Sequence, residues 1–360
     1  MELNWKTHLE SCGAKIIDDK VINYGNPESE LKNSTSSHHA IIADLSHYGL
    51  IRISGSEAQS FLQSQFSNDV TLITESQAQL NSYCSPKGRV LAFFNLFLVN
   101  NNYYVQLPKP LLSSIFKRLT MFKMRADVEL TDVSDSFLCL GLSGIAAETI
   151  LTNKFKELPE SNFGCTSIET DTQNITTIIR ISDSKQQALP RFLLFSNQAT
   201  LISFWQENSE SFLPIGSGNW SLLDIQSGIP TITTETVDAF VPQMLNLHLI
   251  NAVSFTKGCY PGQEIVARTQ YLGKLKKRMY LLTSDYNQTL EPGTDLSSEN
   301  ATDDQSKGKI VNSQLNTKGG IDALAVLQIN SITEGKITVK SNPEIMFSIM
   351  ELPYSFEQKN

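Results

Sequence analysis

Cysteine is scarce in this chain of 360 residues, and the five that occur lie far apart. They stand at positions 12, 84, 139, 165 and 259, with no C-x-x-C pair. An odd, scattered set does not form a disulfide framework, so we expect a reducing compartment. The spacing also argues against a resident iron–sulfur cluster, which needs several thiolates at short intervals. The five histidines show no ligand spacing, and we expect no tightly held metal.

Long hydrophobic runs are missing as well. The most apolar stretch, residues 90–99, contains Asn95 in its middle, whereas a helix that spans a bilayer needs about 20 apolar residues. The N-terminus, MELNWKTHLE, carries acidic residues and no apolar core, so it does not read as a signal peptide. We therefore expect a cytoplasmic protein without membrane contact.

Charged residues make up only 18% of the chain, and the net charge is −8. This balance argues against a disordered protein and against one that wraps nucleic acid, although it leaves room for a local basic patch. The hydrophobic fraction of 40% is enough to fill compact cores. At this length, two or three domains are the default expectation.

The predicted elements form two similar runs of strands and helices. Residues 1–40 read as a polar lead-in. The elements expected in the first run are a strand at 50–55, a helix from 56 with Ser54 or Ser56 as N-cap, a hairpin of strands at 89–99 and 103–107, a helix at 111–122 and a strand at 126–133. Those expected in the second run are a strand at 137–144, a helix at 145–155, strands at 175–182 and 191–196, and a helix at 199–208. Two ferredoxin-like α+β units are the simplest account.

From Arg278 onward the sequence pattern changes to short apolar runs that are separated by Pro-Gly, Gly-Gly and Asn-Pro turns. This pattern predicts a small antiparallel β-barrel. The acidic stretch at 297–305 reads as a solvated loop. We predict an α+β fold with three domains: residues 1–130 together with about 225–275, residues 131–224, and the barrel at 276–360.

One short segment, SFTKGCYPGQEIVAR, could carry chemistry. Gly258, Pro261 and Gly262 force a tight turn around Cys259. Lys257 puts positive charge beside the thiol, which would favour the nucleophilic thiolate, and the spacing of Glu264 and Arg268 suits a short helix after the turn. The residues alone leave two possibilities open, a reactive thiol or a small buried cysteine that closes a bend.

This segment closely resembles the signature of the YgfZ family, folate-binding relatives of the glycine-cleavage T-protein, an aminomethyltransferase. The resemblance continues through residues 242–278 and includes SPKGRVLAF at 85–93, LIRISGSEAQSFLQSQFSNDV at 50–70 and ELPYSF near the end, which resembles the closing strand. It covers roughly residues 40–356. It implies a T-protein-like body around a central cavity, and it makes Cys259 functional, with Lys257 as its activator. The other motif positions that it implies are Gly258, Tyr260, Gly262, Gln263, Glu264, Lys87 and Arg89.

The resemblance also implies tetrahydrofolate or another folate derivative as the cofactor. Such a site needs aromatic faces, a polar partner for the pterin N–H groups and cations for the anionic tail. Trp220 matches a family tryptophan that contacts folate, and Tyr48 stands where the family has a second tryptophan. Gln226 stands where folate-binding relatives often carry Glu, and its neutral amide accepts a weaker hydrogen bond. From residues alone, a tryptophan that caps a core is the favoured interpretation of Trp220. Asp224 lies about 200° away from Gln226 on a helix and is therefore a poor substitute for it.

Basic residues gather between Lys257 and Arg278, opposed there by Glu264 alone. The others in this stretch are Arg268, Lys274, Lys276 and Lys277. They could hold a polyglutamate tail, an RNA phosphate or an acidic partner, or they could simply keep a strand edge from aggregating. Among these, Arg268 is a candidate contact of the folate.

The resemblance implies a protein that binds folate and supports iron–sulfur enzymes, including those that modify tRNA such as the methylthiotransferases. Whether it is an enzyme stays open. The alternatives are a tetrahydrofolate-dependent aminomethyl or methyl transferase and an interaction module without a ligand. We expect no direct binding of nucleic acid.

Overall fold

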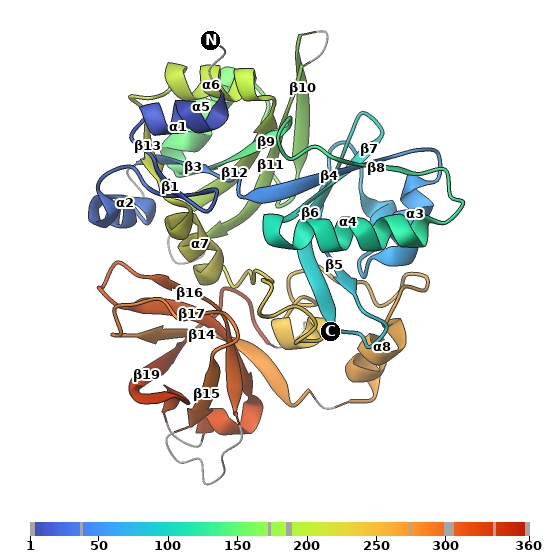
Figure 1. The fold of residues 1–360 in the computed structure, drawn as a ribbon, viewed down its shortest axis with the longest axis vertical. Helices are drawn as coiled ribbons and strands as arrows, with labels where there is room; N and C mark the ends of the chain where they lie inside the picture. Colours follow the sequence, from blue (N-terminus) through green and yellow to red (C-terminus); the bar gives the residue numbers. More distant parts are fainter. Residues whose placement is uncertain are drawn as a thin grey trace.

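The computed structural model describes residues 4–36, 39–171, 174–184, 189–273, 275–298, 306–333 and 336–356. Figure 1 shows two α+β units side by side, with a β-barrel below the second unit. Lys274 and most of the predicted acidic loop at 297–305 lie outside the described residues. The predicted fold class, two α+β units and a C-terminal antiparallel barrel, is confirmed.

The first unit is a five-stranded sheet in the order β5-β6-β7-β4-β8. Its strands are β4 (Tyr48–Ser54), β5 (Gln79–Cys84), β6 (Val90–Val99), β7 (Asn102–Pro108) and β8 (Glu129–Asp132). The helices α3 (Ala58–Gln65) and α4 (Lys109–Lys123) and the 3-10 turn η1 (Val70–Leu72) belong to it. The hairpin of β6 and β7 is confirmed, with Val99 paired to Asn102.

Two details of this unit differ from the prediction. Helix α3 begins after Glu57, without a side-chain cap, because the hydroxyl of Ser56 donates to Asp127 instead, at 2.6 Å. Strand β5 differs from the prediction because its polar residues are buried along with its apolar ones, so the sequence does not show the alternation of apolar and polar residues that predicts a strand. Asn81 is fully buried there and accepts from the backbone N–H of Asn68 at 2.9 Å.

The second unit is a six-stranded sheet in the order β10-β11-β12-β9-β3-β13. Its strands are β3 (Ala40–Asp44), β9 (Leu138–Ser143), β10 (Cys165–Asp171), β11 (Asn174–Ser184), β12 (Leu189–Ser196) and β13 (Phe212–Ile215), and its helices are α5 (Ile145–Phe155), α6 (Gln198–Glu207) and α7 (Ser217–Gln226). Strand β3 joins this sheet although it precedes the first unit in sequence. The division into three domains with the boundaries given above stays a prediction.

The N-terminal forty residues are not a loose lead-in, which corrects the prediction. They form α1 (Trp5–Ser11), the hairpin β1 (Lys15–Ile17) and β2 (Lys20–Asn23), and α2 (Pro27–Ser34). Trp5 is buried, and its indole N–H donates to the carboxylate of Asp44 at 2.8 Å. Its ring meets Trp205 of α6 edge-on, so a few apolar residues anchor a mostly polar segment.

The barrel is closed in the order β14-β17-β16-β15-β18-β19. Its strands are β14 (Lys277–Ser284), β15 (Asp295–Ser298), β16 (Gly308–Leu315), β17 (Ile321–Gln328), β18 (Ile337–Val339) and β19 (Asn342–Met350), with the 3-10 turn η3 (Ile329–Thr333). The segment ELPYSF follows β19 as coil, so the expected closing strand is wrong. Its Tyr354 hydroxyl instead donates to the carbonyl of Gly228 at 2.9 Å, which ties the chain end to the segment after α7.

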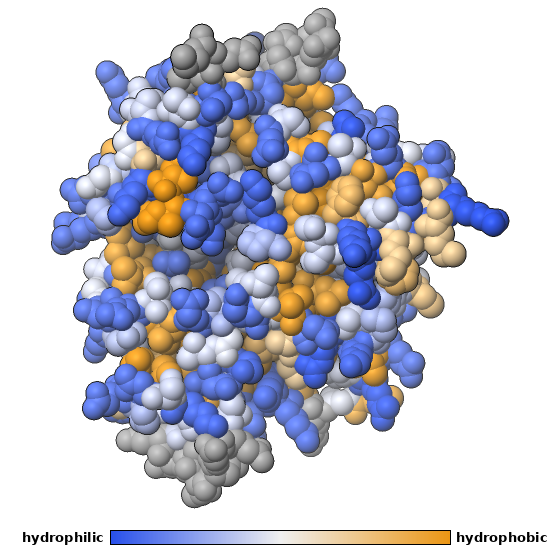
Figure 2. All heavy atoms as spheres, viewed as in Figure 1, coloured by the Kyte–Doolittle hydropathy of each residue, from blue (hydrophilic) through white to orange (hydrophobic). Residues whose placement is uncertain are grey.

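The largest buried hydrophobic cluster joins the first unit to the barrel through residues such as Leu245 and Met279, and another cluster joins the two α+β units. Between α7 and the barrel run η2 (Pro242–Leu245) and α8 (Gln263–Tyr271). Hydrophobic side chains on the face in Figure 2 gather over α4 and the neighbouring strands, while the barrel surface is mostly hydrophilic. No helix within the described parts of the chain is long and apolar enough to cross a membrane.

Candidate functional site: a central cavity and an outer cysteine turn

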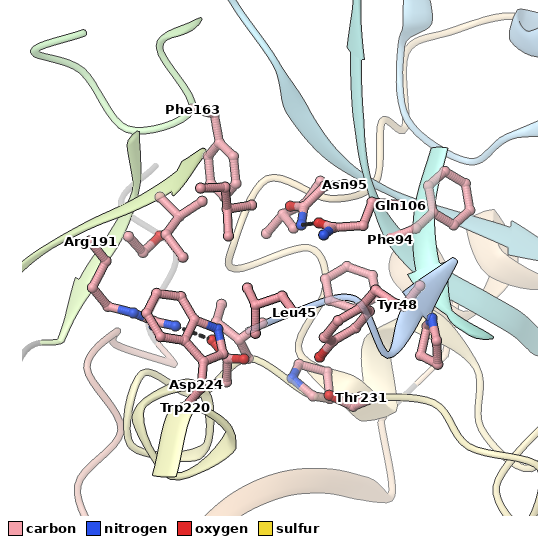
Figure 3. Close-up of a pocket in the computed structure, with 18 residues that line it drawn as sticks. Leu45, Tyr48, Phe94, Asn95, Gln106, Phe163, Arg191, Trp220, Asp224 and Thr231 are labelled. Atoms are coloured by element: carbon pink, nitrogen blue, oxygen red, sulfur yellow. Dashed lines mark hydrogen bonds and ion pairs between the residues drawn. The ribbon is translucent and has the colours of Figure 1, made fainter. Parts of the chain in front are cut away.

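A cavity lies where the two units and α7 meet, and the predicted aromatic pair lines it. Trp220 of α7 and Tyr48 at the start of β4 both face this space of about 70 Å³, as Figure 3 shows. The ring of Trp220 lies against Gly141 of β9, where an added Cβ would approach the ring carbons to 2.7 Å. Only glycine leaves room for the indole here, so β9 fixes the plane of Trp220.

The polar groups of the cavity centre on Asp224. It stands four residues after Trp220, so the two side chains share one face of α7. The guanidinium of Arg191 pairs with its carboxylate and lies 4.6 Å from the centre of the Trp220 ring. Burial raises the pKa of Asp224, and the charge of Arg191 opposes this. The Asp224 side chain still keeps 16% of its surface accessible, so it can accept a hydrogen bond from a ligand.

Further amides and an unpaired donor complete the polar lining. The amide of Asn95 donates to Gln106 at 3.0 Å at the upper edge of the cavity in Figure 3. Arg191 is 1% exposed, and its Nε has no partner among the described residues. A buried donor of this kind is costly unless a ligand or water satisfies it.

Gln226, the predicted polar partner of folate, points elsewhere. Its amide donates to Asp322 of the barrel at 2.9 Å, and both residues are buried. The physical reason is helical geometry: two residues after Asp224, a side chain lies about 200° around the axis. The spacing that places Asp224 in the cavity is i, i+4 from Trp220, and its position relative to Gln226 does not reveal this. The sequence could also have indicated Arg191 as a functional residue, because it is the one charged residue of a largely apolar, buried strand.

The cysteine turn lies outside this cavity. Cys259 is exposed, and all five cysteines are free. The turn residues 257–263 do not appear in the described lining of the cavity. In Figure 1, α8 lies at the outer side of the first unit, while α7 lies between the second unit and the barrel. The thiol and the aromatic pair therefore occupy different places.

The cysteine turn packs backbone to backbone on the SPKGR turn. Gly262 has a φ of +81°, and an added Cβ would meet the carbonyl oxygen of Ser85 at 2.3 Å. Gly88 on the facing turn has a φ of +69°, with Ile265 of α8 directly against it. This contact brings the exposed Lys87 and Arg89 beside the start of α8.

Lys257 is buried, and its ammonium group donates to backbone carbonyls. The acceptors are Gln63 at 2.7 Å, Phe66 at 2.6 Å and Asn68 at 2.9 Å. Burial lowers the pKa of Lys257 to about 8, and Asp69 works against this. Because all three donors are used, this geometry makes Lys257 an anchor of the turn. Its role as activator of Cys259 stays a prediction.

The remaining motif residues hold the turn or face solvent. Tyr260 is buried with its ring 5.4 Å from the Lys257 ammonium. Gln263 donates its amide to the carbonyl of Lys257 at 3.2 Å. Gly258 has open space around its Cα.

Glu264 and Arg268 are exposed, and no ion pair joins them in the described structure. Arg268 also lies outside the described cavity lining. Of the wider basic cluster, Lys257 is internal, and Arg278 lies 4.4 Å over the ring of Phe356. No group of three or more His, Cys, Asp and Glu that could hold a metal ion occurs within the described ranges.

Comparison with known proteins agrees with this architecture. The GCVT N-terminal domain model matches residues 28–185. The aminomethyltransferase T of the glycine cleavage system from Bartonella henselae superposes with a TM-score of 0.77 at 15% identity, covering 96% of this chain and 95% of that one. At this identity the likeness shows the fold, a T-protein-like body.

Closer relatives share the sequence itself. The tRNA-modifying protein YgfZ of Colwellia psychrerythraea is 34% identical over 251 residues, which cover 69% of this chain and 74% of the relative. The protein of the same name from Yersinia enterocolitica is 26% identical over 317 residues, covering 88% and 93%. That of Photobacterium profundum is 29% identical over 321 residues, covering 88% and 92%. Given this identity over most of the length, and the T-protein-like fold, the chain belongs to the YgfZ family.

Proposed function

We propose that this chain binds tetrahydrofolate or another reduced folate in the central cavity. The observation that carries the proposal is the meeting of Trp220, Tyr48 and Asp224 around one space. Flat rings bind well between aromatic faces. Trp220 is already held in place by Gly141, so little side-chain freedom is lost when a pterin stacks on it.

Asp224 takes the role that the sequence resemblance gave to Gln226. Its carboxylate accepts hydrogen bonds from the pterin N–H and amino groups, and a charged acceptor makes bonds about twice as strong as a neutral amide does. Burial raises the pKa of Asp224, while the paired guanidinium of Arg191 opposes this rise and orients the carboxylate. Its unpartnered Nε adds one more donor for an oxygen of the ligand.

Tryptophan fluorescence tests this proposal, because the three tryptophans of the chain lie in two places. Trp5 and Trp205 meet each other at the N-terminal helix, while Trp220 lines the cavity. Tetrahydrofolate should quench the wild-type protein and Trp205→Phe, whereas Trp220→Phe should lose the ligand-dependent quenching. No calorimetric heat and no quenching in the wild type would overturn the proposal.

We further propose that the chain supports tRNA modification, acting through iron–sulfur enzymes with Cys259 as the working thiol. The relatives are named for tRNA modification, and Cys259 is the exposed one of the five cysteines. Because the turn lies outside the cavity, the thiol meets a partner protein or its cluster at the surface. Wild type should restore cluster-dependent tRNA methylthiolation in a deficient strain, and Cys259→Ser should not. Equal rescue by both would overturn this role.

One observation favours a second candidate, a tetrahydrofolate-dependent aminomethyl or methyl transferase. That chemistry needs a carboxylate near the folate nitrogens, and Asp224 supplies one in the cavity. Incubation with tetrahydrofolate and an aminomethyl donor distinguishes the candidates. A one-carbon folate product that disappears in Asp224→Asn would favour the transferase, and the absence of product would leave the accessory role.

A further inference from the structure

Two larger chambers share lining residues with the central cavity. One chamber, of about 430 Å³, shares Tyr48, Asp224 and Thr231 with the cavity. The other, of about 660 Å³, shares Leu80 and Phe163 with it. The cavity alone is smaller than the ~300–1,000 Å³ typical of ligand sites, so a bound folate must extend into one chamber.

The charges that line the chambers differ. The described lining of the 430 Å³ chamber includes one lysine, Lys20 of β2, and three acidic residues, Asp224, Glu235 and Glu291. In the 660 Å³ chamber, the only charged group among the described lining residues is Asp183. It already has a cation, since it lies 3.4 Å from a guanidinium nitrogen of Arg180. An anionic tail therefore finds a partner only on the Lys20 side of the described structure.

The same chamber opposes a longer anionic tail. Asp224 is neutralised by Arg191, which leaves Lys20 facing both Glu235 and Glu291. Lys20 lies close enough to Glu235 to affect its pKa. Hydrogen bonds from Thr234 and Thr233 are the main cause that lowers this pKa, and the charge of Lys20 lowers it further. One tail carboxylate can pair with Lys20, but each further glutamate adds negative charge beside two carboxylates.

We infer that the 430 Å³ chamber binds the glutamate tail of a folate monoglutamate, with Lys20 as the carboxylate partner and Glu235 and Glu291 selecting against polyglutamate chains. This inference rests on the proposed folate binding and adds a specificity to it. It also gives the N-terminal hairpin a function, since Lys20 reaches the chamber from β2.

Calorimetry with 5-formyltetrahydrofolate as monoglutamate and triglutamate, and with tetrahydrobiopterin as a probe without a tail, tests the inference. The triglutamate should bind no more tightly than the monoglutamate. Lys20→Glu should weaken the monoglutamate by roughly 5- to 20-fold and leave tetrahydrobiopterin unchanged. The double variant Glu235→Gln, Glu291→Gln should improve triglutamate binding by a few fold. Lys15→Gln, an exposed lysine of the same hairpin outside the chamber lining, should bind like wild type.

The outcomes separate this inference from the proposed function. A triglutamate that binds more than about fivefold tighter than the monoglutamate in the wild type would overturn the inference and leave folate binding intact. Equal weakening of tetrahydrobiopterin and the monoglutamate in Lys20→Glu would overturn it too. If none of the three probes bound, both the inference and the proposed folate binding would fall.

Discussion

At the scale of single residues, two glycines decide how the cysteine turn meets the SPKGR turn. Gly262 and Gly88 both have positive φ, and each lies within van der Waals distance of the facing turn. A side chain at either position would push the turns apart and strain the backbone as well. Gly258, one residue before the cysteine, is different because nothing lies within 4 Å of where its Cβ would stand.

This difference gives a matched pair of variants. Gly262→Ala should lower the free energy of unfolding by about 2–4 kcal/mol, because strain at positive φ adds to a clash with the Ser85 carbonyl. Gly258→Ala should change it by less than about 1 kcal/mol. Urea unfolding of the two variants measures both values. Similar losses in both would contradict the close packing of the two turns.

Two partly buried histidines make stability depend on pH. Burial, with the charge of Lys20 added, lowers the pKa of His47 to about 3. The unfolded chain binds a proton at His47 below about pH 6.5 while the folded chain does not, so stability is present above that pH and is lost as pH falls toward 3. His248, whose pKa burial lowers to about 4, acts in the same direction.

The expected result is a pH-dependent difference between two proteins. From pH 6 to pH 4, wild type should lose stability relative to His47→Gln by about 1 kcal/mol per pH unit. Unfolding by urea at several pH values measures this, and the carboxylates shared by both proteins cancel in the comparison. His39→Gln, at an exposed position, serves as the control and should follow wild type. Parallel pH curves for wild type and His47→Gln would refute the account.

At the scale of elements, α7 carries the cavity on one face and a link to the barrel on another. Trp220 and Asp224 face the cavity, while Gln226 donates to Asp322 of β17. Asp322 also accepts from Thr283 and from Asn316, both at 2.9 Å. The glutamine at 226, which departs from the family pattern, thus fits a buried carboxylate.

Restoring the family residue should therefore harm this protein. Gln226→Glu places two buried carboxylates together and should lower the free energy of unfolding by about 2–4 kcal/mol at pH 7, with no gain in folate affinity. Adding Asp322→Asn should recover part of this loss, which a double-mutant cycle measures. Tighter folate binding by a stable Gln226→Glu protein would show that residue 226 reaches the ligand.

The sequence predicted the elements whose apolar residues repeat clearly. The strands β4, β6, β7, β9, β11 and β12 were found because their side chains alternate or are buried throughout. Strand β5 was missed because it buries polar residues such as Asn81, whose side chain accepts a hydrogen bond from the backbone N–H of Asn68, outside the strand. The N-terminal helix was missed because seven residues, with Trp5 and Leu9 as the buried apolar ones, carry too little periodicity to be recognised.

The candidate site was predicted only in part. Trp220 and Tyr48 came from the family resemblance, and the structure brings them into one cavity. Arg191 of β12 and Asp224 of α7 are 33 residues apart in sequence, and such long-range pairing leaves no local pattern to detect. The same holds for Lys257, whose acceptors lie almost 200 residues earlier in the chain.

At the scale of the whole molecule, the two α+β units and the segment that follows α7 enclose the cavity, while the cysteine turn stays outside. Folate binding and thiol chemistry can therefore be separated by mutation. Trp220→Ala should abolish folate binding and leave the reactivity of Cys259 toward a thiol reagent unchanged, and Cys259→Ser should do the reverse. Calorimetry and thiol labelling measure the two properties, and loss of both in either variant would contradict their separation.

The most direct test of the central claim is a crystal structure of the protein with tetrahydrofolate. The account predicts density for the pterin between Trp220 and Tyr48, with its N–H groups on the Asp224 carboxylate. A folate bound elsewhere, or a cavity that holds only water at saturating tetrahydrofolate, would contradict it.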